Sequence, residues 1–81
     1  MFKILAIDEV NYINKNGEPV NGTQLTLQDE SNGLIAFNFF KKSTVKGVAK
    51  VGGTCKFITS FRRDNIKKTF IPYISGVEIL N

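Results

Sequence analysis

Segments rich in β-branched and aromatic residues, separated by turns, are what most constrains the fold of this chain. The Asn-Gly pairs Asn16-Gly17 and Asn32-Gly33 each stand in a polar segment of its first half. Asn-Gly tolerates positive φ and is a strong short-range signal for a β-hairpin. The segments between the turns favour strands, because Val, Ile, Thr, Phe and Tyr suit a pleated, half-buried surface. The sequence therefore predicts antiparallel β-structure with little helix.

Five strands are predicted, over residues 2–13, 20–28, 34–40, 54–62 and 69–80. Residues 41–50 carry lysines at a spacing of four but include Gly47, so this segment is either one short helix or an irregular crossover. Three strands, a linking segment and two more strands is the order of an OB-type barrel. We therefore expect an all-β, five-stranded OB-type barrel in which residues 1–81 form a single domain.

The phenylalanines of the third and fourth strands bear on which faces form the core. Phe37, Phe39 and Phe40 occupy both faces of one strand, and we expect two of the three to be buried. In the fourth strand Phe57 and Ile58 lie on opposite faces, and period two does not say which is inside. We expect Ile58 to face inward, which leaves the exposure of Phe57 open.

Two residue types needed for common chemistry are missing or isolated. The chain has no His, which removes the usual general base near neutral pH. Cys55 is the only cysteine, so it has no disulfide partner, no His to activate it and no companions for structural zinc. We expect Cys55 to be a small core residue. The sequence predicts no enzymatic activity and no cofactor or metal.

Charge points to the class of partner. There are 11 Lys and Arg against 7 Asp and Glu, a net charge of +4 that suits a polyanion. No apolar stretch approaches the roughly 20 residues of a membrane span, so we expect no membrane partner and a cytoplasmic location. A core of this size gives a monomer only modest stability, which favours a homodimer.

Binding of single-stranded nucleic acid needs cations along the backbone and flat side chains on which bases stack. Among the aromatic residues, Tyr12 and Tyr73 are good stacking candidates, since a phenol tolerates water at one edge. A plainer alternative stands for every candidate: a solvated charge or a packed core residue. The candidate binding residues are Tyr12, Lys15, Lys41, Lys42, Lys46, Lys56, Phe57, Arg62, Arg63, Lys67, Lys68 and Tyr73.

Three stretches resemble one known family. Residues 16–20, Asn-Gly-Glu-Pro-Val, followed by Gln-Leu-Thr-Leu-Gln-Asp at 24–29, resemble the first hairpin of the filamentous-phage gene V helix-destabilising proteins. Residues 53–61 resemble the penultimate strand of that family, which ends in Ser-Phe before a polar hairpin, and residues 77–80 resemble its closing strand. The resemblance implies an OB-type homodimer that coats single-stranded DNA cooperatively during replication.

The family's binding residues carry over only in part. Lys15 falls where the family has a DNA-contacting Arg, whereas Val20 stands in place of a stacking Tyr. Gly76 and Glu78 stand where the family has two basic contacts, and Ile66 stands near the aromatic tip of a loop that joins neighbouring dimers. We therefore expect the Lys and Arg clusters of this chain to bind from other positions.

Two functions remain open on the sequence. The first is a single-stranded DNA-binding protein of a phage, plasmid or mobile element, located in the bacterial host cytoplasm if phage-encoded. The second is a small β-barrel adaptor that binds protein and no nucleic acid. Neither has a small-molecule substrate. RNA remains open beside DNA, because nothing in the sequence identifies a contact to a 2′-hydroxyl.

Overall fold

The computed structural model describes residues 1–81 and is built almost entirely of strands. The prediction of an all-β chain is confirmed, and every predicted strand lies within two residues of an observed one at each end. The crossover is irregular: a single 3-10 turn leads into a two-residue strand, and there is no α-helix. The elements are β1 (Phe2–Ile13), β2 (Pro19–Asp29), β3 (Ile35–Lys41), η1 (Lys42–Thr44), β4 (Val45–Lys46), β5 (Thr54–Asp64) and β6 (Thr69–Ile79).

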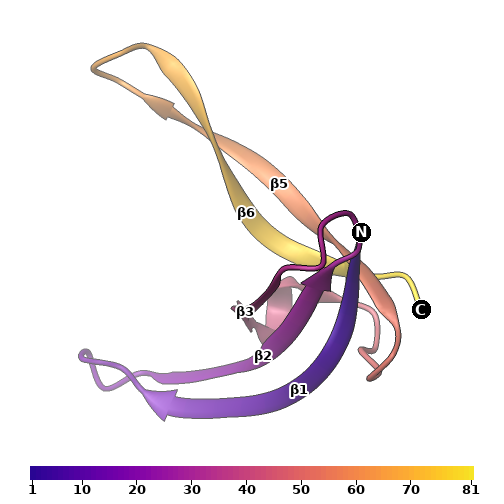
Figure 1. The fold of residues 1–81 in the computed structure, drawn as a ribbon. Helices are drawn as coiled ribbons and strands as arrows, with labels where there is room; N and C mark the ends of the chain where they lie inside the picture. Colours follow the sequence, from indigo (N-terminus) through magenta and orange to yellow (C-terminus); the bar gives the residue numbers. More distant parts are fainter.

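All six strands belong to one sheet with the order β3-β2-β1-β5-β6-β4. Neighbouring strands are antiparallel, except that β4 runs parallel to β6. The structure therefore corrects the expected five strands to six, and the sheet is open because β3 and β4 each pair along one edge only. The central pairing is short: β1 meets β5 only at Phe2–Cys55 and Lys3–Thr54. The three strands β1, β2 and β3 and the β5–β6 hairpin diverge from this junction (Figure 1).

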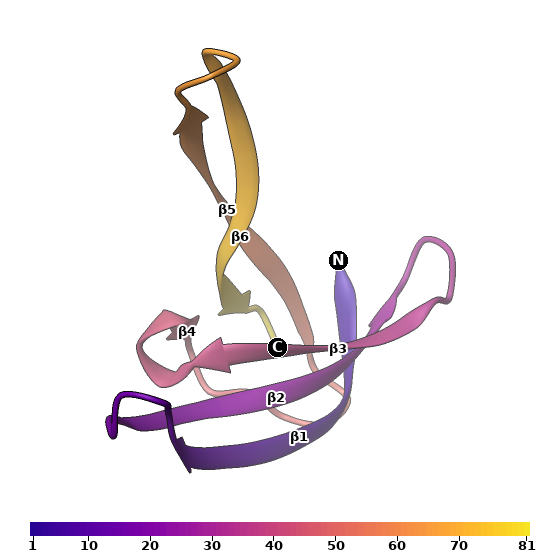
Figure 2. The ribbon, with the colours of Figure 1, turned by 90° about the vertical axis from the view of Figure 1, so that its left-hand side faces the viewer.

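The β5–β6 hairpin rises away from the β1–β2–β3 sheet as an extended arm (Figure 2). We call residues 59–74 the arm. A β-bulge marks its base, because the register shifts between Ile58 and Thr59 and leaves Ser75 unpaired in β6. The Ser75 hydroxyl donates to the Ile58 carbonyl at 3.1 Å and accepts from the Ser60 hydroxyl at 2.9 Å. Bulges bend the strand that carries them, and these bonds hold the bend where the arm leaves the core.

The core lies where the two hairpins join, and it consists of Ile4, Leu25, Leu27, Phe40, Cys55 and Val77. Cys55 is buried as predicted, and burial raises the pKa of its thiol. The expectation that two of three β3 phenylalanines are buried was wrong. Phe40 is buried, but Phe37 is 67% exposed and Phe39 is 41% exposed. Both share the face of β3 opposite to Phe40, and no other element covers that face.

The inward face of β5 is the one that carries Cys55 and Phe57, so the expectation that Ile58 faces inward was wrong. Phe57 pairs with the buried Val77 of β6. Its ring centroid lies 4.3 Å from that of Phe2 and 6.0 Å from that of Phe40. Phe57 is therefore half-buried at the margin of the core.

The crossover after β3 returns the chain to β6 at Gly76. The Thr44 carbonyl lies where a Cβ on Gly76 would be, so this close approach requires glycine. β4 then pairs with β6 through Val45–Val77 and Lys46–Glu78. No helix in the structure has the length and apolar character that crossing a membrane requires.

Candidate nucleic-acid interface

Three exposed aromatic side chains share the outer face of the β1–β2–β3 sheet. The register aligns Tyr12 with Val20, Gln24 with Phe39, and Thr26 with Phe37. Leu25 and Leu27 of β2 point to the core, so their neighbours on β2 and the residues paired with those neighbours point away from it. We call Tyr12, Phe37 and Phe39 the outer aromatic face. An uncovered group of flat side chains on a sheet is the kind of surface on which bases stack.

Gly22 lets two of these rings approach each other. A Cβ at Gly22 would collide with the Phe39 ring and the Phe40 carbonyl, so the ring lies over the bare backbone of β2. The centroids of Tyr12 and Phe39 are 6.4 Å apart, with the rings tilted by 56°. This separation lies within the usual range for interacting aromatic pairs. The ring of Tyr12 on β1 and the ring of Phe39 on β3 therefore form one apolar surface across β2.

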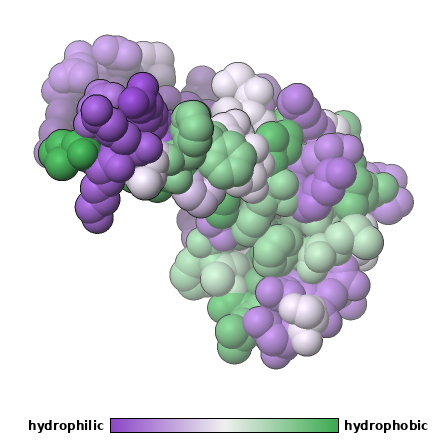
Figure 3. All heavy atoms as spheres, turned by 90° about the horizontal axis from the view of Figure 1, so that it is seen from above, coloured by the Kyte–Doolittle hydropathy of each residue, from purple (hydrophilic) through white to green (hydrophobic).

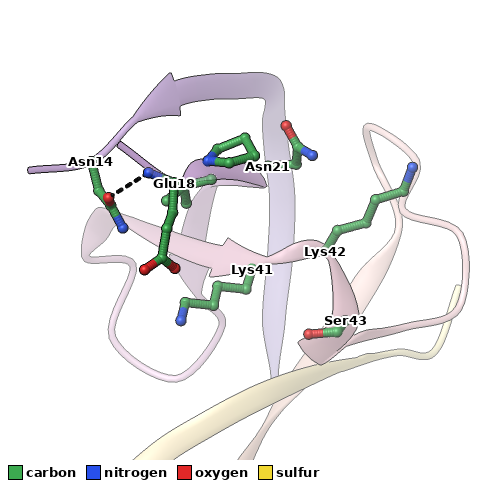
Figure 4. Close-up of a pocket in the computed structure, with 8 residues that line it drawn as sticks. Asn14, Glu18, Asn21, Lys41, Lys42 and Ser43 are labelled. Carbon is green, nitrogen blue, oxygen red and sulfur yellow. Dashed lines mark hydrogen bonds between the residues drawn. The ribbon is translucent and has the colours of Figure 1, made fainter. Parts of the chain in front are cut away.

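Lys41 adds positive charge to this face. It pairs with Gly22, which places it on the same side of β3 as Phe39, two residues away. Figure 4 shows a pocket between the end of β3 and the β1–β2 turn, with Lys41 and Lys42 extending in different directions. The pocket has a volume of about 350 Å³ and is lined by Asn14, Glu18, Pro19, Val20, Asn21, Lys41, Lys42 and Ser43.

The turn beside this pocket presents Lys15. The Asn14 side-chain oxygen accepts the amides of Asn16 and Glu18, each at 3.0 Å, which holds the turn in shape. Lys15 is exposed in this turn. Because the turn and Lys41 border the same pocket, Lys15 lies at the same end of the sheet as Lys41. Glu18 also lines the pocket and reduces the net positive charge there.

The second group of cations lies on the arm, where the register separates two adjacent arginines. Arg62 pairs with Ile71 and shares its face with Tyr73, its diagonal neighbour. Arg63 pairs with Phe70 on the opposite face. One strand of nucleic acid lying on one face of the arm therefore contacts only one of the two guanidinium groups directly.

The tip of the arm is hydrophilic apart from one hydrophobic group (Figure 3). Ile66 lies in the turn there and is 93% exposed. Lys67 and Lys68 lie in the turn between β5 and β6. The Asp64 carboxylate accepts the amides of Ile66 at 2.9 Å and Lys67 at 3.2 Å, which shapes this turn. The two lysines are exposed and extend the positive charge of the arm to its end.

Three other predicted residues, Lys46, Lys56 and Phe57, lie apart from these two groups. The Lys56 ammonium lies 3.8 Å from the Glu78 carboxylate. Glu78 therefore balances part of the charge of Lys56. Lys46 is the strand partner of Glu78 in β4, but it is exposed and forms no salt bridge. The ring of Phe57 packs at the core margin against Phe2, as described above, so it does not present a free face for stacking.

The structure thus divides the predicted residues into separate surfaces. Tyr12, Lys15 and Lys41 belong to the sheet end, whereas Arg62, Tyr73 and the two tip lysines belong to the arm. Phe37 and Phe39 were missed as site residues, although Gly22 was a usable signal, since glycine inside a strand often marks a close approach. No group of three or more His, Cys, Asp or Glu side chains is arranged to hold a metal ion.

Comparisons with protein-family models, with curated proteins and with solved structures found no match to this chain.

Proposed function

We propose that this protein binds single-stranded DNA without catalysing a reaction on it, and that its open sheet is an OB-type scaffold. Bases stack on the outer aromatic face, while Lys15 and Lys41 contact the phosphates beside it. The observation that carries the proposal is the pair of exposed rings, Tyr12 and Phe39, spread over Gly22 next to Lys41.

The physical case rests on what such a surface does in water. Tyr12 is 51% exposed, and together with Phe37 and Phe39 it leaves an apolar area on the sheet that no part of this chain covers. Base–aromatic stacking stabilises a complex by about 1–3 kcal/mol per base and accepts any base, because every base has a π-face. Nearby lysines add affinity by releasing counterions from the phosphates. The combination suits binding of single-stranded nucleic acid with little dependence on its base sequence.

The arm gives the proposal a second basic surface. Arg62 and Tyr73 share one of its faces, and Lys67 and Lys68 extend the charge to the tip. With the resemblance to the gene V helix-destabilising proteins, this supports a protein that coats single-stranded DNA during replication of a phage, plasmid or mobile element in the host cytoplasm.

The test is a titration of fluorescein-labelled oligo-dT, followed by anisotropy at two salt concentrations, with oligo-U as the RNA comparison. The variants Tyr12→Leu and Phe39→Leu keep an apolar side chain but remove the aromatic plane. Phe70→Leu is the matched control, because Phe70 is more exposed, at 74%, but lies on the arm and away from the outer aromatic face.

We expect each substitution on the outer aromatic face to weaken binding by about 1–3 kcal/mol, which is the contribution of one stacked base, and the Phe70 variant to bind like the original. Affinity falls as salt rises if phosphates are contacted. Absence of binding at low salt, or an affinity that ignores salt, contradicts the proposal. Equal binding to oligo-dT and oligo-U broadens the ligand to single-stranded nucleic acid in general.

One observation favours a different function, that of a protein-binding module. Phe61 and Phe70 are both strongly exposed on one face of the arm, and they alone line a wholly apolar depression there. Contiguous exposed apolar surface marks interaction sites in soluble proteins. A co-purifying protein together with no response to any oligonucleotide supports this alternative and excludes the first.

A further inference from the structure

Strand β3 ends the sheet, and its second edge is free. It pairs with β2 along one side only. The strand contains no proline, and the only charged residue in it is Lys41 at its last position. Leu34 just before it, Ile35 at its start and Phe37 in its middle are all exposed. An exposed apolar edge with these features readily accepts another strand.

The backbone of this edge has hydrogen-bonding groups to offer. The Leu34 carbonyl accepts the Asp29 amide at 2.9 Å, so even-numbered residues here direct their backbone toward β2. By alternation, Ile35, Phe37 and Phe39 direct their amides and carbonyls away from β2. None of these three makes a backbone hydrogen bond outside the β2–β3 ladder.

We propose that the free edge of β3 binds β3 of a second copy of this chain, antiparallel and about a two-fold axis at Phe37. In this register the two Phe37 residues form a hydrogen-bonded pair, and Ile35 of each copy lies opposite Phe39 of the other. About six backbone hydrogen bonds join the copies, two for each such pair. The contact is isologous and closes on itself.

The proposed register fills an open pocket beside β3. Leu34 of the second copy lies opposite Phe40, on the face that points to the core. A pocket of about 300 Å³ opens there between β3 and β6, and Phe39, Phe40 and Ile74 are its hydrophobic lining residues. In this register the exposed Leu34 side chain of the second copy points toward this pocket, whose other lining residues, Asn38, Lys41, Thr44 and Ser75, are polar. The neighbouring copy closes part of the gap that keeps the single-chain sheet open.

Charge selects an antiparallel second copy over a parallel one. The turn before β3 carries Asp29 and Glu30, whereas Lys41 and Lys42 lie at the end of the strand. Antiparallel pairing brings the acidic turn of each copy toward the basic end of the other, twice in the dimer. Parallel pairing places like charges together. Complementary charge across an interface fixes orientation and register.

Disulfide trapping tests the register directly, in the absence of DNA, so its outcome does not depend on the proposed function. In the Phe37→Cys variant the two Cα atoms at the axis are about 5.5 Å apart, within the range that a disulfide spans. Ile35→Cys is the matched control, because the two copies of this position are offset by four residues, about 13 Å along the strands. Ile66→Cys, at the most exposed apolar position, reports random collision. The native Cys55 is buried and does not compete.

We expect mild oxidation at micromolar concentration to convert Phe37→Cys to covalent dimer at least ten times faster than either control. A rate no greater than that of Ile66→Cys overturns the proposal, and preferential trapping at Ile35→Cys overturns its register. The original protein should have the mass of a dimer by light scattering, and a monomer at tens of micromolar contradicts the inference.

Charge exchange supplies an independent check by the same mass measurement. Glu30→Lys and Lys42→Glu should each weaken the dimer, because each places like charges across the contact. The double variant should recover it. Failure of the double variant to recover, with both single variants weakened, contradicts the antiparallel arrangement.

Discussion

The ring of Phe39 lies over Gly22 and brings its centroid to 6.4 Å from that of Tyr12. A glycine in the middle of β2 thus joins aromatic side chains from β1 and β3 into one surface. The absence of a Cβ at Gly22 therefore matters twice: it lets β2 and β3 pack closely, and it positions the Phe39 ring in the proposed interface.

The Gly22→Ala variant should lose stability by about 1–3 kcal/mol, since an added methyl forces the Phe39 ring and the Phe40 backbone to move. Urea unfolding measures this loss. In a Phe39→Ala background the loss should shrink without vanishing, because the Phe40 carbonyl still meets the new Cβ. An equal loss in both backgrounds shows that the ring does not occupy this position.

Substitution of the two arm arginines should have unequal effects on DNA binding. Arg62 shares a face with Tyr73, whereas Arg63 lies on the opposite face beside Phe70. If the strand lies on the Tyr73 face, Arg62→Ala weakens binding across all sequences and reduces the salt slope by about 1. Arg63→Ala should leave the slope nearly unchanged. Equal effects of the two variants in the salt titration contradict a single binding face on the arm.

Acid should destabilise the β2–β3 turn through Asp29. The hydroxyl of Ser31 at 2.7 Å and its amide at 2.8 Å both donate to the Asp29 carboxylate, and they lower the pKa of this group below its ordinary 3.8. The stabilisation is present above that value and is lost as pH falls through the lower native pKa. Asp29→Asn should therefore lose less stability than the original between about pH 5 and pH 3. Urea midpoints at both pH values measure the difference, and identical losses contradict the role of Asp29.

Local signals were enough to place the strands. The Asn-Gly pairs at 16–17 and 32–33 both lie in turns between strands, and Gly17 and Gly33 both adopt a φ of 75°. Turn chemistry and β-propensity act over a few residues, so they can be read without knowing the rest of the fold. The two-residue strand β4 was missed because it depends on the approach of Thr44 to Gly76, which are far apart in the sequence.

The candidate site was harder to predict than the strands. Lys15 and Lys41 were named, but the sequence did not show that they lie at one end of the same sheet. Phe57 was named for a stacking role and packs at the core margin instead, while Phe37 and Phe39 were left out and are exposed. In each case the residue type suggested a binding role, but the sequence did not show which other residues surround the side chain in the fold.

By itself, the sequence determined which residues share a face within each regular stretch of strand, because side chains alternate with a period of two wherever no bulge interrupts them. It determined that Phe37 and Phe39 lie together and opposite Phe40, and that Phe57 lies opposite Ile58. Only the tertiary structure decided which of those faces is covered. That depends on Val77 meeting Phe57 from β6, and on the absence of any element over the outer side of β3, and both are properties of strand arrangement.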